Sequence, residues 1–375
     1  MSKAEKRKYN QKVNDKERIL RHLFSVKSCS RRQLCDVLGL SMPTVSKKIS
    51  ELNDEGLISI RTTPSSGNGR KATIVTLRQN AYYSIGVEIQ KHFIRLILLN
   101  FHGKPVLRRQ HRLEYSNSDD YIQALSDMTE ALILDENIAP ERVLGVCISW
   151  PGTIDYQCDS VTLALTLQER DLPLSRYRER FRYPLFFTQD AKASCLREIL
   201  NHPEMPNFVF LYISQLIGGA VVHNGKLLLS RNSRNGEFGH TCLVPRGRRC
   251  YCGNEGCVDA YLSTGVLSEM GGGSLKAFFS KLQGGDTFCL SAWYRYMDHL
   301  IVLLYNLNMA YNTPIMLSGE LAPYLKPWIE YINARVSDLN FFHDGVQILL
   351  SANDITDDAL GAGLISLLHF FRVYK

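Results

Sequence analysis

The spacing of one histidine and three cysteines constrains this 375-residue chain more than any other feature. His240 is followed after nine residues by Cys250, then by Cys252 and Cys257, and two glycines lie between the last two cysteines. Four nitrogen and sulfur ligands supplied by protein alone suit tetrahedral zinc of the structural kind. The seven other cysteines are scattered, which is typical of free thiols in a reducing compartment. We therefore predict that these four residues bind a structural zinc ion.

Positive charge is concentrated in the first fifth of the chain. Residues 1–80 contain 17 Lys or Arg and 7 Asp or Glu, a net charge of +10, whereas the remaining residues carry a net charge of −3. A basic module of this kind suits a polyanion such as DNA, because contacted phosphates release counterions. A solvated basic segment without a partner has the same composition, so the motifs must decide between the two.

Three short helices are predicted after Asn14. Asn14 and Glu17 have the spacing of a capping box at the first helix, Gly39 ends the second, and Ser41 caps the third with Pro43 in its first turn. Two short helices, a tight turn and a third helix with polar residues near its start are typical of a helix-turn-helix. The third helix would enter the major groove, and the residues expected to reach bases or phosphates are Thr44, Ser46, Lys47 and Lys48.

Two strand-like runs, residues 57–62 and 72–77, flank a glycine-rich basic segment. They predict a β-hairpin, or wing, whose tip residues Arg70 and Lys71 contact the minor groove or the flanking phosphates. Residues 1–80 are therefore predicted to form a winged helix-turn-helix that binds DNA. A winged helix that binds only protein is the alternative, and the fold and the charge together favour DNA.

The rest of the chain alternates strands and helices. A strand hairpin, a helix and a buried strand precede Pro151, and a second round of paired strands, helices and strand begins near residue 207. This order is typical of an α/β domain. We expect two related α/β lobes with a cleft between them, residues 81–190 and residues 191–375, and the second lobe contains the metal-binding loop.

Five motifs in these lobes resemble those of the ROK family, named for repressor, open reading frame and kinase. They are Pro151-Gly152-x-x-Asp155, Gln189-Asp190-Ala191-Lys192-Ala193, Ile217-Gly218-Gly219, Gly236-Glu237-Phe238-Gly239-His240 and Cys250-x-Cys252-Gly253-x-x-Gly256-Cys257. The last two are highly specific, and with the winged helix the resemblance to ROK repressors covers nearly the whole chain. It implies an actin-like, ribonuclease H-like sugar-kinase fold, a structural zinc beside the sugar, and similarity to glucose- and N-acetylglucosamine-responsive repressors.

Polyhydroxylated ligands need side chains that form paired hydrogen bonds, chiefly carboxylates and amides. Asp190, Glu237, His240 and Asp259 could supply this chemistry, and the resemblance implies that the corresponding family residues bind sugar. The family usually has Asn at Gln189 and Glu at Asp259, so both functional groups are kept here but moved by one methylene. We therefore predict these five residues as the sugar site. A helix cap for Asp190 and a loop carboxylate for Glu237 are the structural alternatives.

Two turns argue against kinase activity. Phosphoryl transfer depends on positioning and on charge stabilisation at the phosphates, and the resemblance implies two glycine-rich turns for this in ROK kinases. At the first, residues 88–92 read Glu-Ile-Gln-Lys-His without a glycine; at the second, residues 214–219, two of the usual glycines are replaced. We predict that the chain is not an enzyme. A ROK sugar kinase with a regulatory DNA-binding head is the alternative.

Together these features predict a transcriptional regulator, a repressor of carbohydrate metabolism or transport genes, that binds double-stranded operator DNA. A sugar or sugar derivative in the kinase-like cleft is the expected effector, and it must bind one state of the regulator more tightly than the other to shift the equilibrium. A homodimer or homotetramer would present two winged helices to two half-sites. Control by a transport-system protein, and activation instead of repression, are alternatives that fit the same residues.

The predicted location is the cytoplasm. No run of about 18 apolar residues occurs, so no membrane span is expected. The first sixteen residues are polar and charged and lack the apolar segment of a secretory signal.

Overall fold

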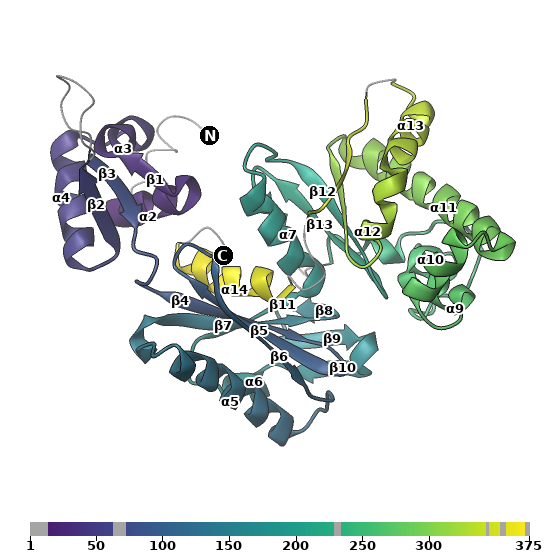
Figure 1. Cartoon of the computed structure of the whole chain (residues 1–375), viewed down its shortest axis with the longest axis horizontal. Coiled ribbons are helices and arrows are strands. Elements are labelled where there is room, and N and C mark those ends of the chain that lie inside the picture. The colour runs from purple at the N-terminus through teal and green to yellow at the C-terminus, as the bar shows by residue number, and fades with distance from the viewer. Residues whose placement is uncertain (1–13, 63–72, 229–233, 343–344, 353–357, 372–375) are drawn as a thin grey trace. The chain divides into compact units, whose positions relative to one another are not determined.

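The computed structural model describes residues 14–62, 73–228, 234–342, 345–352 and 358–371, and Figure 1 shows its elements. The chain divides into two compact units: one comprises Met1–Gly152, Leu163–Thr188 and Ala359–Lys375, the other Thr153–Thr162 and Gln189–Asp358. The last helix thus belongs to the first unit although it follows the second unit in sequence. The division at residues 80 and 190 stays a prediction. Among the described residues, no helix is long and apolar enough to cross a membrane.

Three helices and a small antiparallel sheet form the N-terminal part of the first unit. Its elements are α2 (Asp15–Val26), β1 (Ser28–Ser30), α3 (Arg31–Leu38), α4 (Met42–Asp54), β2 (Ile58–Thr62) and β3 (Thr73–Leu77), with strand order β1-β3-β2. The inner faces of the helices bury Leu23, Leu34, Val45 and Ile49. The three predicted helices and the two wing strands are confirmed. The wing tip, with Arg70 and Lys71, lies outside the described residues.

The helix starts follow local hydrogen bonding. Ser41 caps α4 by accepting a hydrogen bond from the backbone N–H of Thr44, as predicted. Asn14 caps α2 but accepts from Lys16 N, at 3.1 Å, instead of from the third helical position that a capping box requires. The full capping box lies one helix later, where Ser30 and Gln33 satisfy each other's backbone N–H groups.

The rest of the first unit is built around a five-stranded sheet of order β11-β7-β4-β5-β6. Its elements are β4 (Tyr83–Ile89), β5 (Phe93–Asn100), β6 (Pro105–Arg112), α5 (Asp119–Asp135), η1 (Pro140–Arg142), β7 (Val143–Trp150), η2 (Leu165–Leu167), α6 (Ser175–Arg178), β11 (Leu185–Gln189) and α14 (Asp358–Phe370). Helix α14 covers one face of the sheet and α5 the other (Figure 1). Gly86 of β4 permits this packing, because a Cβ there would lie 1.7 Å from the carbonyl oxygen of Ala359. A further three-stranded sheet, β10-β9-β8, comprises β8 (Thr153–Asp155), β9 (Ser160–Ala164) and β10 (Glu169–Pro173), and its strand β8 belongs to the second unit.

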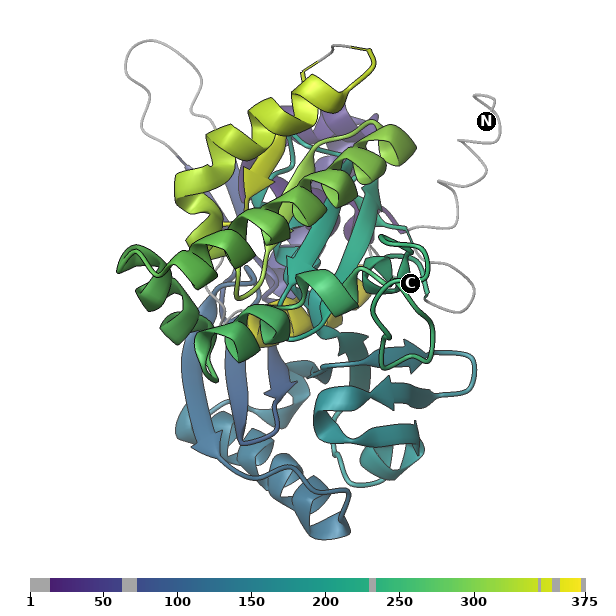
Figure 2. The ribbon, with the colours of Figure 1, turned by 90° about the vertical axis from the view of Figure 1, so that its right-hand side faces the viewer.

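The second unit has its own five-stranded sheet, of order β14-β13-β12-β15-β16. Helix α7 packs on one face through Ala191 and Cys195, and α11 and α13 run side by side on the other face (Figures 1 and 2). The elements of this unit are α7 (Asp190–Asn201), β12 (Phe208–Ile213), β13 (Ile217–His223), β14 (Lys226–Leu227), η3 (Phe238–His240), α8 (Asp259–Leu262), α9 (Thr264–Gly271), α10 (Leu275–Gln283), α11 (Thr287–Tyr311), β15 (Ile315–Ser318), α12 (Ala322–Leu325), η4 (Lys326–Trp328), α13 (Ile329–Leu339) and β16 (Ile348–Leu350).

The two large sheets repeat one topology. In each, the first strand in sequence pairs antiparallel with the second strand and parallel with the strand that follows the next long helix, as β4 does with β5 and β7, and β12 with β13 and β15. The expectation of two related α/β lobes is therefore confirmed. The tight turns β4–β5 and β12–β13 occupy equivalent places in the two sheets.

Candidate metal centre and its neighbouring polar site

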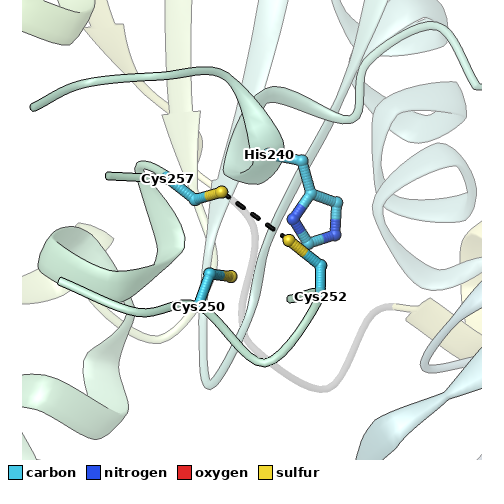
Figure 3. Close-up of side chains that lie close together, drawn as sticks. All are labelled: His240, Cys250, Cys252 and Cys257. Atoms are coloured by element: carbon cyan, nitrogen blue, oxygen red, sulfur yellow. Dashed lines mark hydrogen bonds between the residues drawn. The ribbon is translucent and has the colours of Figure 1, made fainter. Parts of the chain in front are cut away.

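The predicted metal ligands come together in one loop of the second unit. His240 ends the 3-10 helix η3, and the three cysteines follow in the segment between η3 and α8. The four ligand atoms lie within 4.8 Å of one another, and the Sγ atoms of Cys252 and Cys257 are 3.7 Å apart (Figure 3). Backbone hydrogen bonds fold the loop back on itself, including Cys250 N to Asn254 O at 2.8 Å. The cluster is therefore formed by the fold and can hold a metal ion.

The chemistry of these four side chains fits a cation. The Nδ1 atom of His240 is buried and has no hydrogen-bond partner among the described residues. Burial, together with the neighbouring thiols, raises the pKa of the Cys257 thiol to about 12. Thiolates in such surroundings are stable only beside a positive charge, which a bound metal supplies. Gly256 makes the loop possible, since it has a φ of +80° and a Cβ there would lie 1.9 Å from the carbonyl oxygen of Val244.

Glu237 lies three residues before His240 and forms hydrogen bonds with two other parts of the second unit. Its Oε1 accepts from the side-chain amide of Gln189 at 3.1 Å and, less closely, from the hydroxyl of Thr153 at 3.4 Å. Two predicted sugar ligands, Gln189 and Glu237, are thus adjacent. Thr153 was not predicted, and its position directly after the Pro151-Gly152 motif is the only sequence signal for it.

Asp190 and Lys192 stand in the first turn of α7. Asp190 is partly buried, and its Oδ1 accepts from the backbone N–H of Ala191 at 2.7 Å, a local bond of the helix start. The side chain of Lys192 is only 2% exposed. Burial lowers the pKa of its ammonium group to about 8, and the nearby Glu237 carboxylate partly opposes this. A buried lysine beside Glu237 adds a positive charge that sequence reasoning did not assign to the site.

Asp259 follows the last metal ligand by two residues and is 4% exposed. One of its oxygens accepts from the backbone N–H of Ile217 at 2.8 Å, and the other accepts from the hydroxyl of Tyr251 at 2.8 Å. That hydroxyl is also 3.2 Å from Nε2 of His240. Burial raises the pKa of the Asp259 carboxyl. Tyr251 was missed from the sequence, although its place between two metal ligands could have indicated it.

A small open cavity of about 200 Å³ lies beside Tyr251 and Asp259, with Leu216, Ser263 and Glu269 also in its wall. Its volume is below the range of roughly 300–1,000 Å³ that is common for ligand sites.

A buried ion pair joins strands β4 and β5 of the first unit next to the turn between them, where Glu88 and Arg95 are cross-strand partners. Glu88 is 2% exposed, and both its oxygens accept from Nη1 of Arg95, at 2.9 and 3.0 Å. Gln90 also donates to this carboxylate at 3.0 Å. Burial raises the pKa of Glu88, and Arg95 opposes that effect. The end of β4 is thus held by charged and polar side chains of its own hairpin.

The predicted DNA-contacting residues are spread over the start and middle of α4. Lys47 is exposed, whereas Thr44, Ser46 and Lys48 are partly buried. The hydroxyl of Thr44 is 2.8 Å from that of its capping residue Ser41, and Lys48 forms an ion pair with Glu51 at 3.0 Å. Lys47 is therefore the most accessible of the four for a partner.

Comparison with known proteins identifies the family. A model of the ROK family matches residues 84–324, more than half of the chain. The xylose repressor of Bacillus spizizenii is 26% identical over 382 residues, which cover 97% of each chain. The crystal structure of a ROK family transcriptional regulator, a homolog of the E. coli MLC protein, has a TM-score of 0.78 at 19% identity and covers 95% of this chain and 98% of that chain. The ROK hexokinase of Thermus thermophilus has a TM-score of 0.65 at 20% identity and covers 77% of this chain and 99% of its own.

The two solved structures confirm the predicted fold class, an actin-like sugar-kinase scaffold that follows an N-terminal helical region. Solved structures at 19–20% identity show the fold alone, and the match to the family model shows the family. The chain belongs to the ROK family.

Proposed function

We propose that this protein is a transcriptional repressor that binds operator DNA through its N-terminal winged helix and responds to a carbohydrate bound in its second unit. The observation that carries the proposal is the combination of two features in one chain. A helix-turn-helix with a wing sheet lies in the segment that holds the excess positive charge, and it precedes a ROK domain. The similarity to a xylose repressor along 97% of the chain supports the same function.

The same proposal excludes phosphoryl transfer. The first turn, Gln90-Lys91-His92, has no glycine and adjoins the buried Glu88–Arg95 pair, and the second turn keeps only Gly218 and Gly219 of its usual glycines. Positioning of ATP is the main contribution of the protein to this reaction, so a chain without phosphate turns lacks the means for it. A coupled ATPase assay with a panel of sugars is expected to show no turnover, and sugar-dependent turnover would contradict the proposal.

We propose that the metal is zinc and that its role is structural. A Cys₃His set fills all four tetrahedral positions with protein ligands and leaves none open for chemistry. His240 and the three cysteines would hold the ion, and the ion would fix the loop that contains His240 and Tyr251. In this way zinc supports the carbohydrate site without touching the effector.

DNA binding is the first property to test. The full-length protein is titrated into fluorescently labelled fragments from upstream of its own coding sequence, at several salt concentrations, with and without D-xylose and other sugars. We expect specific binding that a sugar weakens. Lys47→Ala should lower the affinity and reduce the slope of log affinity against log salt by about one, because one phosphate or base contact is lost. Lys276→Ala, which removes an exposed lysine of α10, is the matched control.

The outcomes separate the possibilities. Equal affinity of Lys47→Ala and the unmodified chain at matched salt would remove α4 from the DNA interface. Binding that no sugar alters, in a chain that still binds its operator, would point to control by a protein partner. We propose that the protein forms a homodimer or homotetramer, which presents two winged helices to two half-sites. Light scattering with and without DNA measures the assembly.

A further inference from the structure

The hydroxyl of Tyr251 lies between two residues that were predicted to bind carbohydrate. It donates a hydrogen bond to Oδ2 of Asp259 at 2.8 Å and is 3.2 Å from Nε2 of His240. His240 would hold a metal ion through its buried Nδ1, and Nε2 would then carry the proton and donate to the tyrosine oxygen. In that tautomer the hydroxyl accepts from the imidazole while it donates to the Asp259 carboxylate. A sugar hydroxyl bound at this point would form the same two hydrogen bonds.

The protein fixes the position of the Asp259 carboxylate. Its Oδ1 accepts from Ile217 N at 2.8 Å, so each oxygen already has a protein donor. Gly239 confines it further, because a Cβ on that residue would lie 3.2 Å from both Cγ and Oδ2 of Asp259. The carboxylate is thus held in place by backbone on two sides and by Tyr251 on the third.

The position of Tyr251 is tied to the metal loop. It stands between Cys250 and Cys252, so a metal ion held by these residues would fix its backbone on both sides. The residue is 41% exposed, whereas its hydroxyl donates a hydrogen bond to the buried Asp259. The ring therefore lies at the edge of the site, where loss of the hydroxyl leaves the fold of the loop intact.

We propose that Tyr251 is a specificity-determining residue, whose phenol hydroxyl takes the place of one carbohydrate hydroxyl between His240 and Asp259. This inference rests on the proposed carbohydrate response. The site then excludes carbohydrates that present a hydroxyl at that point, and it accepts those that lack one there. Gln189 acts in the same direction, since its amide supplies Glu237 with a hydrogen bond that a ligand hydroxyl could otherwise make.

Removal of the single hydroxyl tests the proposal. The full-length, zinc-loaded protein and its Tyr251→Phe variant are titrated by calorimetry with D-xylose, D-glucose and N-acetyl-D-glucosamine. The variant should bind at least one of these about tenfold more tightly, because a ligand hydroxyl gains the two partners that the phenol held. Tyr294→Phe, which alters an exposed tyrosine on α11, is the matched control and should leave sugar affinity unchanged. Unchanged or weaker sugar binding by Tyr251→Phe would overturn the proposal.

Metal analysis accompanies each titration, and the expected zinc content is equal in all three proteins. If Tyr251→Phe does not fold, the unmodified protein still gives an answer with monodeoxy analogues of each sugar. The proposal expects one analogue that binds at least as tightly as its parent, and about tenfold weaker binding of every analogue would contradict it. Operator binding is measured on the same samples. Its absence would refute the proposed function, whereas normal operator binding with unaltered sugar affinities would refute only the role of Tyr251.

Discussion

The metal ligands and the carboxylates beside them differ in what the protein provides for them. Nδ1 of His240 has no hydrogen-bond partner among the described residues, and the thiols of Cys252 and Cys257 face each other at 3.7 Å. Glu237 and Asp259, by contrast, accept hydrogen bonds from side chains and backbone of the same unit. A buried group without a partner destabilises the fold until a ligand arrives, whereas a satisfied group does not. We therefore propose that a metal ion on His240 is needed to order this loop, whereas the two carboxylates keep their positions without an effector.

Loss of one thiol should have the largest effect. Cys257→Ala removes a ligand that is 2% exposed, and we expect the variant to lose its zinc and more than about 4 kcal/mol of unfolding free energy. Cys242→Ala is the matched control, because Cys242 is exposed, lies in the same loop and is outside the cluster. Metal analysis and urea unfolding measure both quantities. Full zinc content in Cys257→Ala would remove this residue from the ligand set.

Lys192 provides an intermediate case, a buried charge whose pKa is lowered by burial although the nearby Glu237 carboxylate opposes the shift. Its pKa is lowered to about 8, so below that pH the folded state holds a charged ammonium at a cost that the unfolded state does not bear. As the pH rises from about 8 to the ordinary 10.5, the folded protein releases this proton while the unfolded chain keeps it, and stability increases. Lys192→Met has no buried ammonium group, so its folded state does not carry this free-energy cost at any pH. We expect it to be more stable than the unmodified protein by about 1–3 kcal/mol at pH 7.

The pH dependence of that difference is the decisive measurement. Urea unfolding of both proteins between pH 7 and pH 10 should show the advantage of Lys192→Met shrinking above pH 8, because only the unmodified protein gains stability there. Lys276→Met, at an exposed site, should show no such trend. A difference that stays constant with pH would mean that the lysine pays no burial cost in the folded state.

The metal cluster could be predicted from the sequence more fully than the hydrogen bonds of the neighbouring carboxylates. The metal cluster needed only spacing, because Cys250, Cys252 and Cys257 lie within one short loop and thiolates have few other uses in such a pattern. The buried faces of the helices and the wing strands followed from periodicity. The sequence did not predict that the capping box lies at Ser30 instead of Asn14. Both positions have suitable residues, and the backbone geometry at the helix start determines which one forms the capping box.

The polar site was less predictable because its partners are distant in sequence. The contact between Gln189 and Glu237 joins the start of α7 to the loop before η3, and no local pattern states which atoms meet. The same holds for Tyr251, whose partner Asp259 was itself expected to face a sugar. Residue type indicated hydrogen-bonding capacity correctly, but whether protein or ligand uses that capacity depends on side-chain length and on the fold.

Shortening Gln189 should give the smallest effect and test that conclusion directly. Gln189→Asn keeps the amide but withdraws it by one methylene, so the 3.1 Å hydrogen bond to Glu237 is lost. We expect a loss of about 1 kcal/mol of unfolding free energy, since one hydrogen bond to a charged group disappears from a largely buried site. The freed oxygen of Glu237 then becomes available to a ligand, so sugar affinity should rise while stability falls. Gln157→Asn, in an exposed turn of the same unit, should change neither quantity. If Gln189→Asn lowered both stability and sugar affinity, Gln189 would itself contact the carbohydrate. The hydrogen bonds of Glu237 would then be shared with the ligand, and this carboxylate would no longer differ from the metal ligands in needing a bound group.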